Sequence, residues 1–166
     1  AFDLDADPAL IEPVLAGLPD AAGPGLRLPG ALDGFEVAVR AILGQQVSVA
    51  AARTLAARVV ARFGTHLATP HPGIDRLFPE AATLAAASPA ALGRLGIVRQ
   101  RVRALQGLAT AVADGSLRLD RGAPLATTLG QLSAIPGIGD WTTQLIALRA
   151  LAWPDAYGSY RVSKPL

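Results

Sequence analysis

The sequence predicts an all-α fold, a compact domain built from several helices. Along most of the 166 residues, apolar side chains recur at intervals of three and four, the period of an amphipathic helix. The alternation of apolar and polar residues that marks a half-buried strand is nearly absent, and Gly- or Pro-containing links are mostly short. Because 51% of the residues are hydrophobic, the chain can bury a core and disorder is not expected.

Capping residues mark the first two helices. Asp7-Pro8 suits an N-cap followed by Pro at the first helical position, so we expect a helix over 8–18. A Gly- and Pro-rich link follows over 19–30. Asp33 then caps a helix that carries the apolar residues Phe35, Val37, Val39, Ile42 and Leu43.

A polar turn separates this helix from the next one. Gly44-Gln45-Gln46 interrupts the apolar pattern, and Ser48 caps a third helix that stops at Gly64. Residues 65–79 contain three prolines and are predicted to form a loop. The remaining helices are expected over 80–87, 89–95, 97–113, 124–134 and 140–151.

Composition excludes several kinds of site and partner. Without cysteine the chain can form no disulfide, thiolate zinc site or cysteine-bound iron–sulfur cluster, and His66 and His71 lack the neighbours that zinc requires. The formal net charge is only +2, so any attraction for phosphate must come from local charge and backbone dipoles. No apolar run reaches the roughly 20 residues of a membrane span. We expect a cytoplasmic monomer with no membrane partner.

One stretch predicts contact with a phosphate. In Ile135-Pro136-Gly137-Ile138-Gly139, the proline ends one helix and the glycines permit a tight turn. Asp140 or Trp141 opens the next helix, whose first amides lack partners inside that helix. Such amides, at the positive end of the helix dipole, can hold a phosphate. This is a helix–hairpin–helix signature, although a Pro-Gly turn alone could be a plain αα-hairpin.

Two long segments carry a resemblance to a known family. Residues 136–149 (PGIGDWTTQLIALR) and 35–48 (FEVAVRAILGQQVS), the latter preceded by Leu-Pro-Gly at 28–30, resemble the 3-methyladenine DNA glycosylase II family in sequence and in order. The resemblance covers nearly the whole chain. It implies one DNA-glycosylase-like helical core over 1–166, part of a longer protein with a β-rich N-terminal region and further C-terminal helices.

The resemblance also implies roles for individual residues in holding duplex DNA. Members of this family flip a damaged base out of the helix, and a wedge residue fills the gap. That position is Gln46; the alternative is an ordinary turn residue. Trp141 and Leu145 would bind the base, with the indole stacking on a cationic purine; Trp141 could instead belong to the core. The phosphate would contact the hairpin residues Pro136, Gly137, Ile138, Gly139 and Thr142.

Other family features concern cofactors and the reaction type. Trp141 occupies the position of the Schiff-base lysine in related lyases, so a monofunctional glycosylase is expected. No cofactor is expected except a monovalent cation, Na⁺ or K⁺, on the carbonyl oxygens of Ser133, Ile135 and Ile138. The basic run Arg99–Arg103 could contact phosphate or be a solvated helix face.

The sequence departs from the family at the catalytic aspartate. That position holds Ser159 when the alignment is set on Val162, and Arg161 when it is set on Pro154. A hydroxyl supplies no anion opposite a developing sugar cation, so an impaired site is expected. Asp155 is the nearest carboxylate, and we expect it to be a loop cap.

Three functions follow from this sequence. The first is base excision repair by hydrolysis of the N-glycosidic bond of alkylated purines, 3-methyladenine and 7-methylguanine, in duplex DNA. The second is a catalytically impaired DNA-binding fragment that keeps the hairpin and lacks the aspartate. The third is a structural helical domain, which would show no salt-dependent DNA binding.

Overall fold

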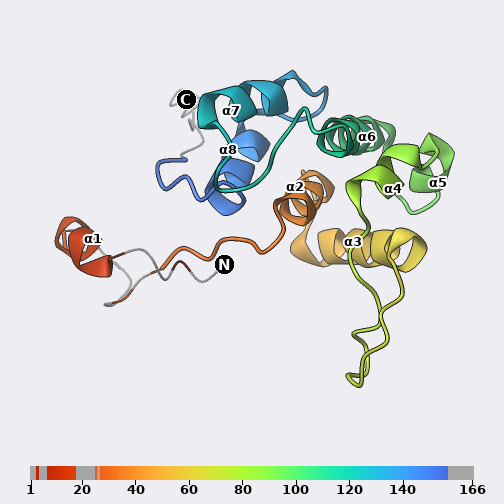
Figure 1. The fold of residues 1–166 in the computed structure, drawn as a ribbon, viewed down its shortest axis with the longest axis horizontal. Helices are drawn as coiled ribbons and strands as arrows, with labels where there is room; N and C mark the ends of the chain where they lie inside the picture. Colours follow the sequence, from red (N-terminus) through yellow and green to blue (C-terminus); the bar gives the residue numbers. More distant parts are fainter. Residues whose placement is uncertain (1–2, 4–6, 18–24, 26, 157–166) are drawn as a thin grey trace, which may run out of the picture.

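The structure is a computed structural model that describes residue 3, residues 7–17, residue 25 and residues 27–156. The described part is helical, as predicted, and its regular elements are all α-helices (Figure 1). None of these helices is long and apolar enough to cross a membrane. The helices are α1 (Pro8–Leu15), α2 (Gly34–Leu43), α3 (Val49–Phe63), α4 (Ala81–Ala86), α5 (Pro89–Gly93), α6 (Arg99–Ala113), α7 (Leu125–Ala134) and α8 (Asp140–Arg149).

Side-chain caps begin four helices, and the predicted ones at Asp7, Asp33 and Ser48 are confirmed. The carboxylate of Asp33 accepts hydrogen bonds from the first two amide groups after Gly34, at 2.8 and 3.2 Å. Asp7, Ser48 and Ser88 cap α1, α3 and α5 in the same way. Each cap satisfies an amide that the helix itself leaves unpaired, which stabilises a helix by about 1 kcal/mol.

Helix α2 is the centre of the core, and α3, α6 and α8 pack against it. Its residues Ala38, Val39, Ile42 and Leu43 are fully buried. Burying side chains such as Ile and Leu contributes about 1.5–3 kcal/mol each. The turn that follows α2 therefore begins from a helix that is packed against α3, α6 and α8.

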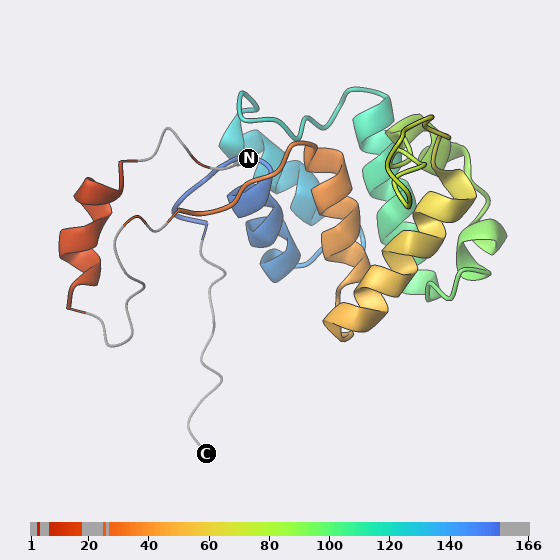
Figure 2. The ribbon, with the colours of Figure 1, turned by 90° about the horizontal axis from the view of Figure 1, so that it is seen from below.

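Helix α1 lies apart from the other helices in both ribbon views (Figures 1 and 2). Its side chains Leu10 and Val14 are each 76% exposed, and the core cluster of the described residues begins at Phe35. The predicted range 8–18 was too long, because the helix ends at Leu15.

Residues 65–79 form no helix, as predicted, but they are more ordered than a simple loop. Two extended segments pair around an antiparallel bridge between His66 and Arg76. Hydrogen bonds from the amide of Leu67 to the carbonyl of Asp75 and from the amide of Leu77 to that of Thr65 hold them together. Residues 65–79 thus form an arm that projects from the end of α3 (Figure 1). No group of three or more His, Cys, Asp or Glu side chains among the described residues could hold a metal ion.

Candidate functional site

The hairpin between α7 and α8 has the tight turn that the sequence predicts. Gly137 has a φ of +96°, and the amide of Ile138 donates to the carbonyl of Ile135 at 3.0 Å. A Cβ on Gly137 would lie 3.1 Å from the Cβ of Ala104 on α6. Glycine is thus required there both for the left-handed backbone and for contact with α6.

Gly139 has a different role from Gly137. Its φ is −91°, and an added Cβ would meet no atom within 4 Å. The fold itself therefore does not require glycine at this position. A side chain there would project into the open space in front of α8, where a ligand would approach its amides.

The start of α8 presents unpaired amides. No acceptor among the described residues takes the N–H groups of Gly137, Gly139 or Thr142. Pro136 and Gly139 are exposed, so the turn can be reached from outside. Ile138 and Thr142 are buried as whole residues, 5% and 3% exposed, so the accessible part of the turn is at Pro136 and Gly139.

The turn between α2 and α3 lies opposite this hairpin. Gln46 is exposed and has a φ of +52°, a left-handed conformation that costs a non-glycine residue about 1–2 kcal/mol. Its neighbour Gln45 is half-buried and donates from Nε2 to the carbonyl of Gly137 and to Oγ1 of Thr142, both at 3.0 Å. The carbonyl of Gln45 accepts from Arg101 Nη2 at 2.5 Å.

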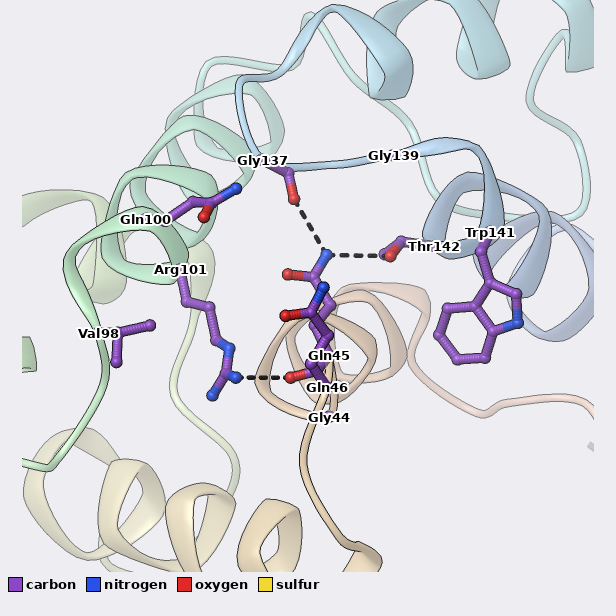
Figure 3. A pocket seen from close by; sticks show the side chains of 10 residues that line it. All are labelled: Gly44, Gln45, Gln46, Val98, Gln100, Arg101, Gly137, Gly139, Trp141 and Thr142. Atoms are coloured by element: carbon purple, nitrogen blue, oxygen red, sulfur yellow. Dashed lines mark hydrogen bonds between the residues drawn. The ribbon is translucent and has the colours of Figure 1, made fainter. Parts of the chain in front are cut away.

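These segments surround one hollow of about 610 Å³. It is lined by the turn after α2 (Gly44, Gln45, Gln46), by the start of α6 (Val98, Gln100, Arg101) and by the hairpin (Gly137, Gly139, Trp141, Thr142). Figure 3 shows the two glutamines between Arg101 on one side and Trp141 on the other. The hollow thus joins the two segments that the sequence analysis singled out, although about 90 residues separate them along the chain.

Trp141 is at the edge of this hollow and is 55% exposed, so it is not a core residue. Its indole also lines a second hollow of about 360 Å³, which Leu145, Val37, Arg40 and Arg149 share. Trp141 and Leu145 therefore line the same concavity.

The basic run at the start of α6 is divided between two surfaces. Arg101 faces the main hollow and donates to the carbonyl of Gln45 in the turn after α2. Arg99 and Arg103 line a separate hollow next to α5. The run is therefore not one continuous face for phosphate, because residues two apart on a helix point in different directions.

No acidic side chain is among the described residues that line the main hollow. Asp155 is exposed in a turn closed by the bond from Ala156 N to Trp153 O, which fits a loop residue. Hydrogen bonds from Ser116 and Arg118 lower the pKa of Asp114 and Asp120, respectively, and these carboxyl groups follow α6. Ser159 lies outside the described residues.

The predicted cation ligands lie along the α7 end of the hairpin. The carbonyl of Ile135 already accepts from the amide of Ile138 and retains a second lone pair. Ser133 is exposed in the last turn of α7, and its hydroxyl lies 3.5 Å from that of Thr143. Nothing in this arrangement tests the cation, which remains a prediction.

Sequence reasoning missed Gln45 as a functional candidate. The pattern Gly-Gln-Gln drew attention to the second glutamine, whereas the first one makes the bonds to the hairpin. A polar residue flanked by two well-formed helices was the available signal, because a half-buried amide needs partners.

Comparisons with known proteins identify the family of the chain. Residues 39–159 match the family described as "HhH-GPD superfamily base excision DNA repair protein". The chain is 43% identical over 156 residues to DNA-3-methyladenine glycosylase 2 of Escherichia coli, covering 94% of this chain and 54% of that protein. It is 42% identical over 161 residues to the probable bifunctional transcriptional activator/DNA repair enzyme AlkA of Mycobacterium tuberculosis, covering 94% of this chain and 32% of that protein.

Solved structures share the fold. The 8-oxoguanine glycosylase/lyase of Clostridium acetobutylicum, bound to double-stranded DNA, superposes with a TM-score of 0.79 at 19% identity over 95% of this chain and 56% of that one. The 3-methyladenine DNA-glycosylase of Archaeoglobus fulgidus superposes with a TM-score of 0.66 at 24% identity, covering 81% of this chain and 44% of that one. The chain spans about a third of the length of the Mycobacterium tuberculosis relative and about half of that of the Escherichia coli relative.

Proposed function

The chain belongs to the HhH-GPD superfamily of base excision DNA repair proteins, and on that premise we propose that it binds duplex DNA and releases alkylated purines. The bases are 3-methyladenine and 7-methylguanine, and the reaction is hydrolysis of the N-glycosidic bond without cleavage of the strand. One observation carries the proposal. The unpaired amides of the hairpin, the exposed Gln46 and the exposed Trp141 all border one hollow.

Each of these groups suits one step of base release. The amides of Gly137, Gly139 and Thr142 hold a phosphate of the damaged strand, since they lie at the positive end of α8. Gln46 enters the stack when the base leaves it, and its amide can also bond the orphaned base. Trp141 stacks on the flipped base, with Leu145 beside it. The face of the indole attracts a cationic purine more strongly than a neutral one.

A duplex with a single 7-methylguanine tests this function. The purified chain is incubated with the duplex, and released base is measured by chromatography, while strand breaks are measured with and without alkali. We expect free base to be released without alkali. Strand breaks should appear only after alkali treatment. Trp141→Ala serves as the paired variant, because its side chain is half exposed and its loss leaves the core intact.

A second function is favoured by the lining of the main hollow, which holds no described acidic residue, and by Ser159 at the position of the family's aspartate. In this alternative the chain binds DNA and does not release the base. Binding that weakens with salt, together with no free base after long incubation, would select it.

We also propose that the hairpin uses a monovalent cation, Na⁺ or K⁺, and that no other cofactor is needed. The carbonyls of Ser133, Ile135 and Ile138 would hold it, and their neutral oxygens suit such ions. Duplex affinity is compared in K⁺ and in a bulky organic cation at the same ionic strength. Equal affinity in the two solutions argues against the cation.

A further inference from the structure

We infer that Gln45 is a positioning residue that fixes the wedge Gln46 relative to the phosphate-holding hairpin. The inference rests on the proposed function and deepens it. It concerns a residue that does not have to touch DNA. Gln45 would act through Gln46, by making the turn between α2 and α3 and the turn between α7 and α8 one rigid unit.

The side chain of Gln45 is held entirely by the hairpin. Its Nε2 carries two hydrogens, and the two acceptors at 3.0 Å are the carbonyl of Gly137 and the hydroxyl of Thr142. One acceptor lies in the tight turn and the other in the first turn of α8. The bonds therefore link the wedge turn to the same residues whose amides are offered to the phosphate.

The main chain of Gln45 is held from another direction. Arg101 of α6 donates to its carbonyl oxygen, which belongs to the peptide group that leads into Gln46. That bond fixes the plane of this peptide group, while the side chain fixes the position of Gln45. Gln46 has its left-handed φ of +52° directly after these restraints. A strained backbone persists where its surroundings determine it, and here the surroundings are Gly137, Thr142 and Arg101.

Matched variants can separate positioning from general stability. Gln45→Met keeps the length of the side chain and removes both hydrogen bonds. Gln106→Met is the control, because Gln106 is also half-buried and its Nε2 donates to a backbone carbonyl, that of Ala87, away from the hollow. Gln46→Ala removes the wedge itself. The double variant Gln45→Met/Gln46→Ala completes a cycle.

The experiment measures the affinity of the full chain for two duplexes, one intact and one with an abasic-site analogue opposite 2-aminopurine. Their ratio gives the abasic preference, and the emission of 2-aminopurine shows whether a side chain fills the gap. We expect Gln45→Met to lower the preference roughly tenfold and to abolish the emission change, with intact-duplex affinity within about twofold. Gln46→Ala should lower the abasic preference by the same factor. The double variant should lower it no further than either single variant.

Four results would overturn the inference. Gln45→Met could keep the abasic preference, or the losses from Gln45→Met and Gln46→Ala could multiply in the double variant. Gln106→Met could lower the preference as much as Gln45→Met does, which would mean that stability alone is measured. Wild-type protein could bind intact duplex with no abasic preference. That result would contradict the wedge role of Gln46 but not the proposed DNA binding. A wild-type chain without any salt-dependent duplex binding would contradict the proposed function itself.

Discussion

The side-chain nitrogen of Gln45 lies 3.0 Å from the carbonyl oxygen of Gly137, although 92 residues separate the two along the chain. This bond joins the two segments that resemble the glycosylase family most closely. It explains why the turn after α2 and the hairpin before α8 border a single hollow.

The two hairpin glycines should respond differently to substitution by alanine. Gly137→Ala places a Cβ 3.1 Å from Ala104 on a backbone with positive φ, so we expect a loss of about 1–3 kcal/mol in the free energy of unfolding. Gly139→Ala meets no protein atom and should keep stability within about 0.5 kcal/mol while weakening duplex binding. Urea denaturation and DNA titration measure the two effects. Equal stability losses would contradict this division of roles.

Replacing the wedge by glycine should separate stability from function. Gln46→Gly relieves the left-handed strain but makes the unfolded chain more flexible, so stability should be unchanged or rise by up to about 1 kcal/mol. The abasic preference should fall, because glycine cannot fill the gap in the stack. Thermal unfolding and duplex affinity are measured on the same preparations. A clear loss of stability would show that the Gln46 side chain supports the fold.

Trp141 should matter for the base and little for the fold. Because its side chain is 55% exposed, Trp141→Ala should change the free energy of unfolding by less than about 1 kcal/mol and should abolish base release. Stacking can be followed directly in a Trp153→Phe background, where Trp141 is the remaining tryptophan. Its fluorescence should be quenched by a duplex with a flipped base, and an unchanged spectrum would count against stacking.

The position of the catalytic carboxylate can be tested both by removing a carboxylate and by introducing one. Asp155 is exposed and does not line the main hollow, so Asp155→Asn should leave the rate of base release within about twofold. Ser159→Asp should raise that rate by about 10²–10⁴ if the family's carboxylate belongs there. Single-turnover kinetics on a duplex with 7-methylguanine give both values. A slow Asp155→Asn variant would instead identify Asp155 as the catalytic carboxylate.

Local features of this fold follow from the sequence because their causes are local. Asp33 and Ser48 begin helices by accepting hydrogen bonds from residues two or three positions away. Pro136 and Gly137 set the hairpin turn through their own backbone restrictions. The arm over 65–79 was expected to be a loop, since its pairing depends on bonds between residues eight to twelve apart.

The site itself depends on contacts that no local pattern reveals. The partners of Gln45 are 92 and 97 residues away, and Arg101 approaches from a third helix. The positive φ of Gln46 is not predicted by its residue type, because non-glycine residues seldom adopt it. Likewise the arginines of α6, which appear as one basic run in the sequence, are divided between two surfaces.

The central claim is that the bare amides at the start of α8 hold a phosphate of duplex DNA. Titration of the ¹⁵N-labelled chain with an abasic duplex, followed through each backbone amide resonance, tests it most directly. The amides of Gly137, Gly139 and Thr142 should shift first and furthest, and their shifts should reverse with added salt. Shifts confined to Arg99 and Arg103, with the hairpin amides unmoved at saturation, would contradict it.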